Sequence, residues 1–391
     1  MSAKIRFALI VKSYKEVEVF DITVVGGGII GLSCAYTLAK NGLKCILIEQ
    51  STFGGRCSSA SLGALWPSSP LRLSAYTEAH WESLRIFPEM AKELEETSGM
   101  KINYQRCGSL KLLTHPSQHK NALLEAEEST KHPNAPDMKL LTEKELADLE
   151  PNVVPSPLGA LYCPSAASVD TSALLEALIA ACRISGVTLR EKCTALKILR
   201  DGDKISGVYT AKGEIRCEKV VLCCGSWTSN MDPYINRFAT ITPVKGQACI
   251  LEGKHPLVRS IVRMKSSYIM QRGDSLVCIG SSTEPDSGFD EKPTGDVQKK
   301  ILENAIAFCP KLKSYSTKAH LAGLRPRSRD RKPYIGKISE IDGLYIAAGH
   351  YKTGFSMMPF TATYLSELIT SGNSEKLAPF TVSRKVKGWE K

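Results

Sequence analysis

The sequence predicts an α/β fold with two lobes, one around a mainly parallel sheet and one around an antiparallel sheet. Residues 21–49 read as strand, helix and strand, which is the βαβ unit of a parallel sheet. The apolar run 219–224 returns to that sheet much later in the chain. Strands between 242 and 288 alternate apolar and polar residues, as an antiparallel sheet with one solvated or ligand-facing side does. A chain of 391 residues can bury a core in each lobe.

The first βαβ unit contains a glycine-rich turn. Asp21–Val25 is a short apolar run with β-branched residues, typical of a strand buried on both faces. The next six residues, 26–31, have the spacing G-x-G-x-x-G and begin a segment with helical periodicity. Asn41-Gly42 ends this helix, and the buried strand 45–48 then leads to Glu49.

Each part of this unit suits the binding of a dinucleotide. Gly26 allows a tight turn, Gly28 lets the backbone approach a pyrophosphate, and Gly31 lets the helix pack closely on the strand. The helix N-terminus offers N–H groups to the phosphates, and Glu49 can accept hydrogen bonds from a ribose diol. A merely structural glycine turn is the alternative, and the motif does not choose between FAD and NAD. The order of the elements favours a Rossmann-like dinucleotide-binding domain.

The segments after Glu49 alternate between loops, helices and strands. The loop 54–65 is small and polar and could wrap a pyrophosphate or lie against a flat ring, although a flexible surface loop is its simpler interpretation. Residues 125–136 are charged and contain proline, so we expect them to be exposed. Periodicity predicts helices at 73–98, 141–149 and 170–185, and strands at 108–113, 186–189, 195–198, 205–210 and 219–224.

The last third of the chain first builds the antiparallel sheet and then returns to the first lobe. Predicted strands lie at 248–251, 267–272 and 276–280, followed by a helix at 296–308. The buried strand 344–350 and the helix 359–369 form a second strand–turn–helix unit, whose helix N-terminus could meet the cofactor.

Composition narrows the class of protein. A hydrophobic fraction of 43% and a charged fraction of 23% are those of a soluble globular protein, and no apolar run is long enough to span a membrane. Residues 1–19 read as an N-terminal extension rather than a signal peptide. The 13 cysteines form no C-x-x-C pair and the seven histidines lack ligand spacing, which predicts reduced thiols, a cytoplasmic location and no metal site. The net charge of +11 is spread along the chain, so we expect an anion-attracting surface and no nucleic-acid partner.

Four further motifs give the sequence a family resemblance. The motifs are Gly225-Ser226-Trp227, Gly323-Leu324-Arg325-Pro326, Pro333-Tyr334-Ile335-Gly336 and Gly349-His350-Tyr351. Together with the glycine turn they resemble the D-amino acid oxidase family of FAD-dependent amine oxidases, and within it the glycine oxidases. The resemblance extends from Asp21 to about Ile369. The resemblance implies a discontinuous FAD-binding domain (20–98, 158–240 and 325–391) and a substrate domain (99–157 and 241–324) whose sheet covers the flavin. No Cys lies in the turn 350–356, so the FAD is expected to be non-covalent.

The resemblance also implies site residues. Arg325 would bind the carboxylate of an amino acid through its guanidinium fork, and Tyr268 would add a hydroxyl; the alternatives are a surface charge and a cross-strand aromatic residue. Strand alternation puts Met270, two residues after Tyr268, on the same side of that strand, where it could only add bulk. The expected cofactor contacts are Gly26, Gly28, Ile29, Ile30, Gly31, Glu49, Gln50, Arg56, Cys57, Ser58, Leu62, Gly63, Ala64, Ala195, Gly225, Trp227, His350, Tyr351, Lys352, Thr353, Gly354, Phe355 and Ser356.

Two departures from the family bear on the substrate. Lys352 and Thr353 stand where glycine oxidases usually have Arg and Asn, and an ammonium does not replace a planar fork. Lys352 is therefore a candidate substrate contact of altered geometry. Ala64 and Leu65 stand where the family often has a methionine near the flavin, so we expect a roomier pocket than glycine needs.

The expected activity is oxidative deamination of glycine or another small amino acid, with O₂ reduced to H₂O₂. The resemblance further implies a homo-oligomer and a link to thiamine biosynthesis. Two alternatives stay open: an FAD-dependent dehydrogenase of the same fold that passes electrons to a quinone, and a non-catalytic or RNA-modification-associated flavoprotein, to which only the basic charge points.

Overall fold

The computed structural model describes residues 18–384, and its first sheet is the mainly parallel sheet that the sequence predicts. Its central strands are β17 (Tyr334–Lys337), β18 (Leu344–Ala348), β11 (Gly213–Leu222), β1 (Val19–Val25), β2 (Cys45–Ile48) and β8 (Thr188–Arg190), in that order. All neighbours are parallel except β17 and β18. The βαβ prediction is thereby confirmed.

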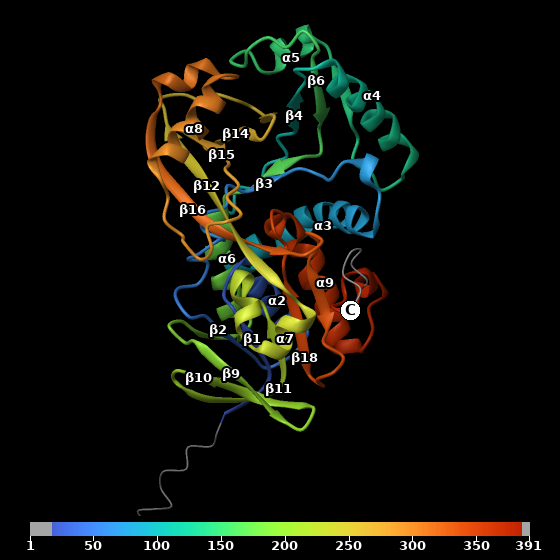
Figure 1. Cartoon of the computed structure of the whole chain (residues 1–391), viewed down its shortest axis with the longest axis vertical. Coiled ribbons are helices and arrows are strands. Elements are labelled where there is room, and N and C mark those ends of the chain that lie inside the picture. Colours follow the sequence, from blue (N-terminus) through green and yellow to red (C-terminus); the bar gives the residue numbers. More distant parts are fainter. Residues whose placement is uncertain (1–17, 385–391) are drawn as a thin grey trace, which may run out of the picture.

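Both faces of this sheet are covered, which explains why its strands are continuously apolar. The helices α2 (Ile29–Lys40), α3 (Ala75–Ser98), α6 (Thr171–Ile184) and α9 (Gly354–Ser371) pack on one another over one face (Figure 1). Ile22, Val24 and Leu47 belong to the core on that side. On the other face Val25, Ile46 and Ile48 pack with the hairpin of β9 (Ala195–Asp201) and β10 (Lys204–Thr210) and with α7 (Pro233–Phe238).

The second sheet forms the other lobe. Its order is β16 (Ser316–Ser328), β12 (Ile241–Glu252), β15 (Leu276–Gly280), β14 (Ser267–Arg272), β13 (Ile261–Met264), β4 (Ser109–Leu112), β6 (Ala160–Cys163) and β5 (Lys139–Leu141). Neighbouring strands are antiparallel, as predicted, except that β13 and β4 are parallel. The helix α8 (Gly295–Ile306) packs on one face, where Cys249, Val277 and Phe308 belong to the core. The opposite face contacts the first lobe, where Leu62 packs with Ala248 and Met270.

Smaller elements lie between the two lobes: β3 (Ala64–Leu65), which pairs with β7 (Ala167–Ser168), and the 3₁₀ turn η3 (Gly225–Asn230), which contacts strands of both sheets. The helices α4 (Pro116–Lys131) and α5 (Glu143–Leu149) belong to the second lobe, beside β4 and β6 in Figure 1. Among the helices of residues 18–384, none has the length and apolar character that a membrane crossing requires.

Several expectations differ from the structure. The segment 125–136 is exposed only in part: its first residues, to Lys131, form the end of α4, where Glu127 and Lys131 are exposed but Glu125 and Ser129 are buried. The Glu125 carboxylate is tolerated there because it pairs with Lys111 Nζ at 2.9 Å. The helix expected at 359–369 begins earlier, at Gly354. Strand pairing puts β6 and all of β16 in the second sheet, close to the expected domain boundaries at 158 and 325, and these boundaries stay predictions. Residues 1–17 of the extension and the end of the FAD-binding domain, 385–391, lie outside the described residues.

Candidate functional site

A cavity of about 480 Å³ lies where the two lobes meet, and its size is typical of a small-molecule site. Its lining combines the glycine turn after β1, the loop 54–64, the turn 349–356 and the face of the second sheet that contains Tyr268 and Arg325. Every site residue expected from the sequence lines it except Gly31 and Met270. Met270 is buried instead among Leu62, Ala248 and Cys278.

The glycine turn has the close packing that the motif requires. Gly26 has φ +107°, and a Cβ there would lie 2.4 Å from the carbonyl oxygen of Cys223. A Cβ on Gly31 would lie 1.8 Å from the carbonyl oxygen of Gly26, so only glycine lets α2 approach the turn. Gly31 therefore acts by packing, which explains its absence from the lining.

The N-terminus of α2 is open toward the cavity. Its N-cap Gly28 has no side chain to cap the helix, and no acid stands in the first turn. The Ile29 N–H donates to Ser58 Oγ at 3.0 Å. Ser58, an expected cofactor contact in the loop 54–65, therefore lies against the start of the helix. Free backbone donors and the positive end of the helix dipole fit the pyrophosphate of FAD.

Glu49 is held rigidly beside the turn. Its Oε2 accepts a hydrogen bond from the Gly27 N–H at 2.8 Å, and its Oε1 accepts from the backbone and hydroxyl of Ser51 at 2.8 and 3.0 Å. Both lone pairs of Oε1 are thus used, and Oε2 keeps one. Oε2 can therefore accept one further hydrogen bond, as from a ribose hydroxyl, and Gln50 and Ala195 also line the cavity.

Arg56 bridges the two lobes as well as lining the cavity. Its guanidinium lies 4.7 Å from the Trp227 ring and forms an ion pair with Glu291. The Trp227 ring in turn packs on Phe289, with ring centroids 5.6 Å apart. The predicted phosphate-loop residue thus contacts the segment that follows β15.

Arg325 and Tyr268 lie on the second sheet, and both line the cavity. The Arg325 guanidinium lies over Gly246, where a Cβ would be 2.0 Å from its Cζ. Its Nη1 donates to the Ser282 carbonyl at 2.9 Å and its Nη2 to Ser281 Oγ at 3.1 Å. These are neutral acceptors, so the charge of the fork stays available to an acid group.

The Tyr268 ring is fixed by its neighbours. It packs edge-on against Trp66, with centroids 5.1 Å apart, and covers Gly280, where a Cβ would be 2.1 Å from its Cε1. Burial raises the pKa of Tyr268 well above its usual value, and Arg325 only partly opposes this. The phenol is therefore neutral and can donate a hydrogen bond.

The turn 350–356 is anchored on α3 rather than by charges. His80 is buried, and its two ring nitrogens are 2.7 Å from the hydroxyls of Ser68 and Ser356. Thr353 Oγ1 is 2.9 Å from Tyr76 Oη. Burial lowers the pKa of His80 to about 4, so its ring is neutral at physiological pH. Lys352 is exposed at the cavity edge, and its Nζ donates to Thr283 Oγ1 at 3.2 Å.

Sequence reasoning missed several lining residues, among them Trp66, His80 and Ser281. Trp66 directly follows the loop that the sequence singled out, so its proximity to that loop was an available signal. His80 lies within the helix predicted at 73–98, and Ser281 follows the end of the strand predicted at 276–280. Neither has a local pattern that marks a site.

Comparisons with known proteins agree with this geometry. The model of the FAD dependent oxidoreductase family, DAO, matches residues 21–368. A glycine oxidase from Pseudomonas aeruginosa is 31% identical over 89% of this chain and 94% of its own length. The crystal structure of a glycine oxidase from Bacillus cereus superposes with a TM-score of 0.86, is 30% identical, and is matched over 94% of this chain and 99% of that one.

A longer relative is also similar. The bifunctional protein ThiO/ThiG of a Nostoc species is 28% identical over 91% of this chain but only 54% of its own length. The family match covers most of the chain, and the cavity presents the dinucleotide cradle that such a family needs. The chain therefore belongs to the DAO family of FAD-dependent oxidoreductases, and its cofactor is FAD.

Proposed function

We propose that the protein oxidises glycine or another small amino acid. The observation that carries the proposal is the position of Arg325 and Tyr268 in the same cavity as the dinucleotide cradle. The similarity to glycine oxidases supports the choice of a small amino acid. When bound, FAD supplies the redox chemistry: a hydride leaves Cα of the substrate, the imine is hydrolysed to a 2-oxo acid and ammonia, and O₂ is reduced to H₂O₂.

The protein's part is to bind and orient the amino acid. The free N–H groups of Arg325 bind the carboxylate, because two of its five donors are used by Ser281 and Ser282. The Tyr268 hydroxyl donates to the same carboxylate, and Trp66 fixes the phenol ring. Holding a substrate carbon in place in this way lowers the entropic cost of the reaction.

The test compares wild-type holoenzyme with Arg325→Ala. We expect anaerobic addition of glycine, sarcosine or D-alanine to bleach the wild-type flavin, and Arg325→Ala to raise KM about 10- to 100-fold while keeping bound flavin. Lys318→Ala is the matched control, because Lys318 lies on the same strand β16 but pairs with Glu252 at the surface. Loss of flavin from Arg325→Ala, or an unchanged KM, would contradict the proposed role.

The electron acceptor is tested in the same preparation. Oxygen consumption with stoichiometric H₂O₂ release supports an oxidase, whereas flavin reduction without H₂O₂ release supports a dehydrogenase. An unreduced flavin with all three amino acids would contradict both. We also propose that an imine formed from glycine feeds thiamine biosynthesis, which the similarity to the ThiO/ThiG protein supports.

A further inference from the structure

The segment that fixes Arg325 has little regular structure of its own. Residues 281–294, here called the bridging segment, connect β15 to α8 and contain no helix and no strand beyond one bridge between Glu284 and Lys245. Its first two residues supply both acceptors of the Arg325 guanidinium. The position of the fork therefore depends on what holds this segment in place.

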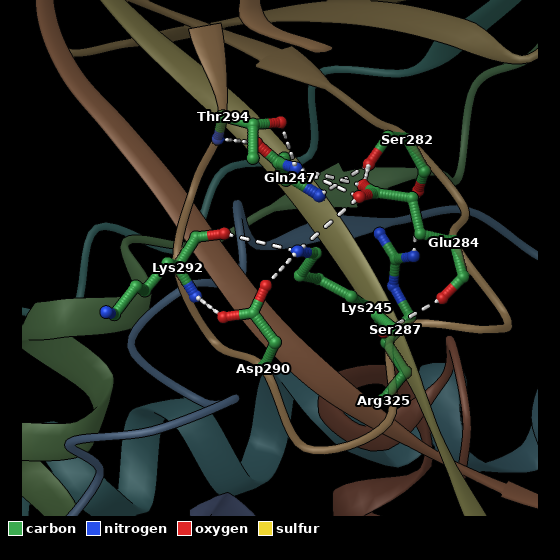
Figure 2. A network of polar contacts seen from close by, with 9 residues as sticks. All are labelled: Lys245, Gln247, Ser282, Glu284, Ser287, Asp290, Lys292, Thr294 and Arg325. Carbon is green, nitrogen blue, oxygen red and sulfur yellow. Dashed lines mark hydrogen bonds and ion pairs between the residues drawn. The ribbon is translucent and has the colours of Figure 1, made fainter.

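Two side chains of β12 hold the bridging segment (Figure 2). Lys245 Nζ is 2.7 Å from Asp290 Oδ2, 3.7 Å from Glu284 Oε2 and 3.3 Å from the carbonyl oxygen of Lys292. Gln247 Nε2 donates to both oxygens of Glu284 at 3.1 Å. Gln247 Oε1 accepts from the N–H of Thr294 at 2.8 Å. Together the two side chains attach the segment at its beginning and at its end.

The two anchors are buried, so solvent does not replace their contacts. Lys245 is 4% exposed and Gln247 is fully buried. Removing one partner from such a network leaves the other partners without compensation, which is more costly than losing a surface pair. Lys318, by contrast, forms a surface ion pair with Glu252 on the same two strands.

The anchors, on β12, and the fork, on β16, lie on opposite faces of the second sheet. Side chains alternate along β12, and Gly246, between Lys245 and Gln247, lies beneath the Arg325 guanidinium. Neither anchor lines the cavity. The anchors act on the substrate through Ser281 and Ser282, which hold the Arg325 guanidinium. The Gln247 N–H donates to Ser282 Oγ at 2.8 Å, and the Gln247 carbonyl accepts from the Ser282 N–H at 3.0 Å.

We infer that Lys245 and Gln247 are positioning residues for substrate binding: they anchor the bridging segment so that Ser281 and Ser282 hold the Arg325 fork at the cavity. This inference rests on the proposed role of Arg325 as the carboxylate anchor. If the inference is right, the network of Figure 2 affects the affinity for substrate; if the network only stabilises the lobe, it does not.

The test is a double-mutant cycle on the holoenzyme. Lys245→Met should raise KM for glycine about tenfold, because a misplacement near 1 Å costs up to about a hundredfold in a reaction step. It should weaken the binding of acetate, followed as a change in the visible flavin spectrum, by a similar factor. In the Arg325→Ala background the same substitution should change neither value, because its effect passes through the fork. Lys318→Met is the matched control.

Asp290→Asn keeps the test decisive if Lys245→Met does not fold. The Asp290 side chain is 49% exposed, so the substitution removes the nearest partner of Lys245 with little risk to the core. We expect a smaller rise in KM, again absent in the Arg325→Ala background. Equal KM for wild type, Asp290→Asn and any folded Lys245→Met, or an additive effect with Arg325→Ala, would overturn the inference. If Arg325→Ala alone still raises KM for glycine as expected, the proposed function stands even when the inference about Lys245 and Gln247 is overturned.

Discussion

Adding one methyl group at Gly246 should displace the substrate anchor without touching the cofactor site. A Cβ at residue 246 would lie 2.0 Å from Cζ of Arg325 and 2.1 Å from both Nη atoms. Non-bonded carbon atoms need about 3.5 Å, so the guanidinium would have to withdraw by about 1.5 Å. Such a shift breaks its hydrogen bonds to Ser281 and Ser282, which are 3.1 and 2.9 Å long.

The expected result for Gly246→Ala is a fall in kcat/KM for glycine of about a hundredfold, since a 1 Å misplacement can cost that much. Bound flavin and Tm should stay close to wild type, because the clash is with the end of a flexible side chain rather than with backbone. Steady-state H₂O₂ release, flavin absorbance and thermal unfolding measure the three quantities. Gly295→Ala is the control, since a Cβ there meets nothing within 4 Å. An unchanged kcat/KM in Gly246→Ala would refute the assignment of Arg325.

Two further predictions concern the cofactor and the pH dependence of stability. In Gly31→Ala the new Cβ would lie 1.8 Å from the Gly26 carbonyl oxygen and should push α2 away from the turn. The purified variant should therefore contain less flavin, measured by visible absorbance, and have a lower Tm. Gly295→Ala should show neither change. Burial lowers the pKa of His80 to about 4, below the ordinary value of 6.5. Between pH 6.5 and 4 the His80 ring is therefore protonated in the unfolded chain but stays neutral in the folded one. Tm should therefore fall as the pH drops from about 6.5 toward 4, and His80→Gln should make that fall shallower. A Tm profile of His80→Gln parallel to that of wild type would show that His80 does not contribute.

Local sequence was enough for the cofactor end of the site. A strand, a glycine turn and a helix that are contiguous in the chain must lie together, so Gly26, Gly28 and Glu49 could be placed from spacing alone. The substrate end was less accessible to this reasoning. Arg325 and Tyr268 were found through the family resemblance, and Met270, assigned by strand alternation next to Tyr268, packs into the core instead of the cavity.

The remaining features depend on contacts between residues distant in sequence. Trp66 and Tyr268 meet only because the loop after β2 lies against the second sheet, and His80 reaches Ser356 across 276 residues. The burial of Lys245 could not be expected from its residue type, because a lysine in a strand ordinarily marks a solvated face. It is buried because the bridging segment brings Asp290 and Glu284 over it.

The sequence by itself determined the elements, the two sheets and the cofactor cradle, because hydrophobic period and turn chemistry are properties of neighbouring residues. Tertiary structure alone decided which side chains line the cavity and how the Arg325 fork is held. Those outcomes depend on how the two lobes pack and on which polar groups must be satisfied once they are buried, and neither is encoded in any single stretch of the chain.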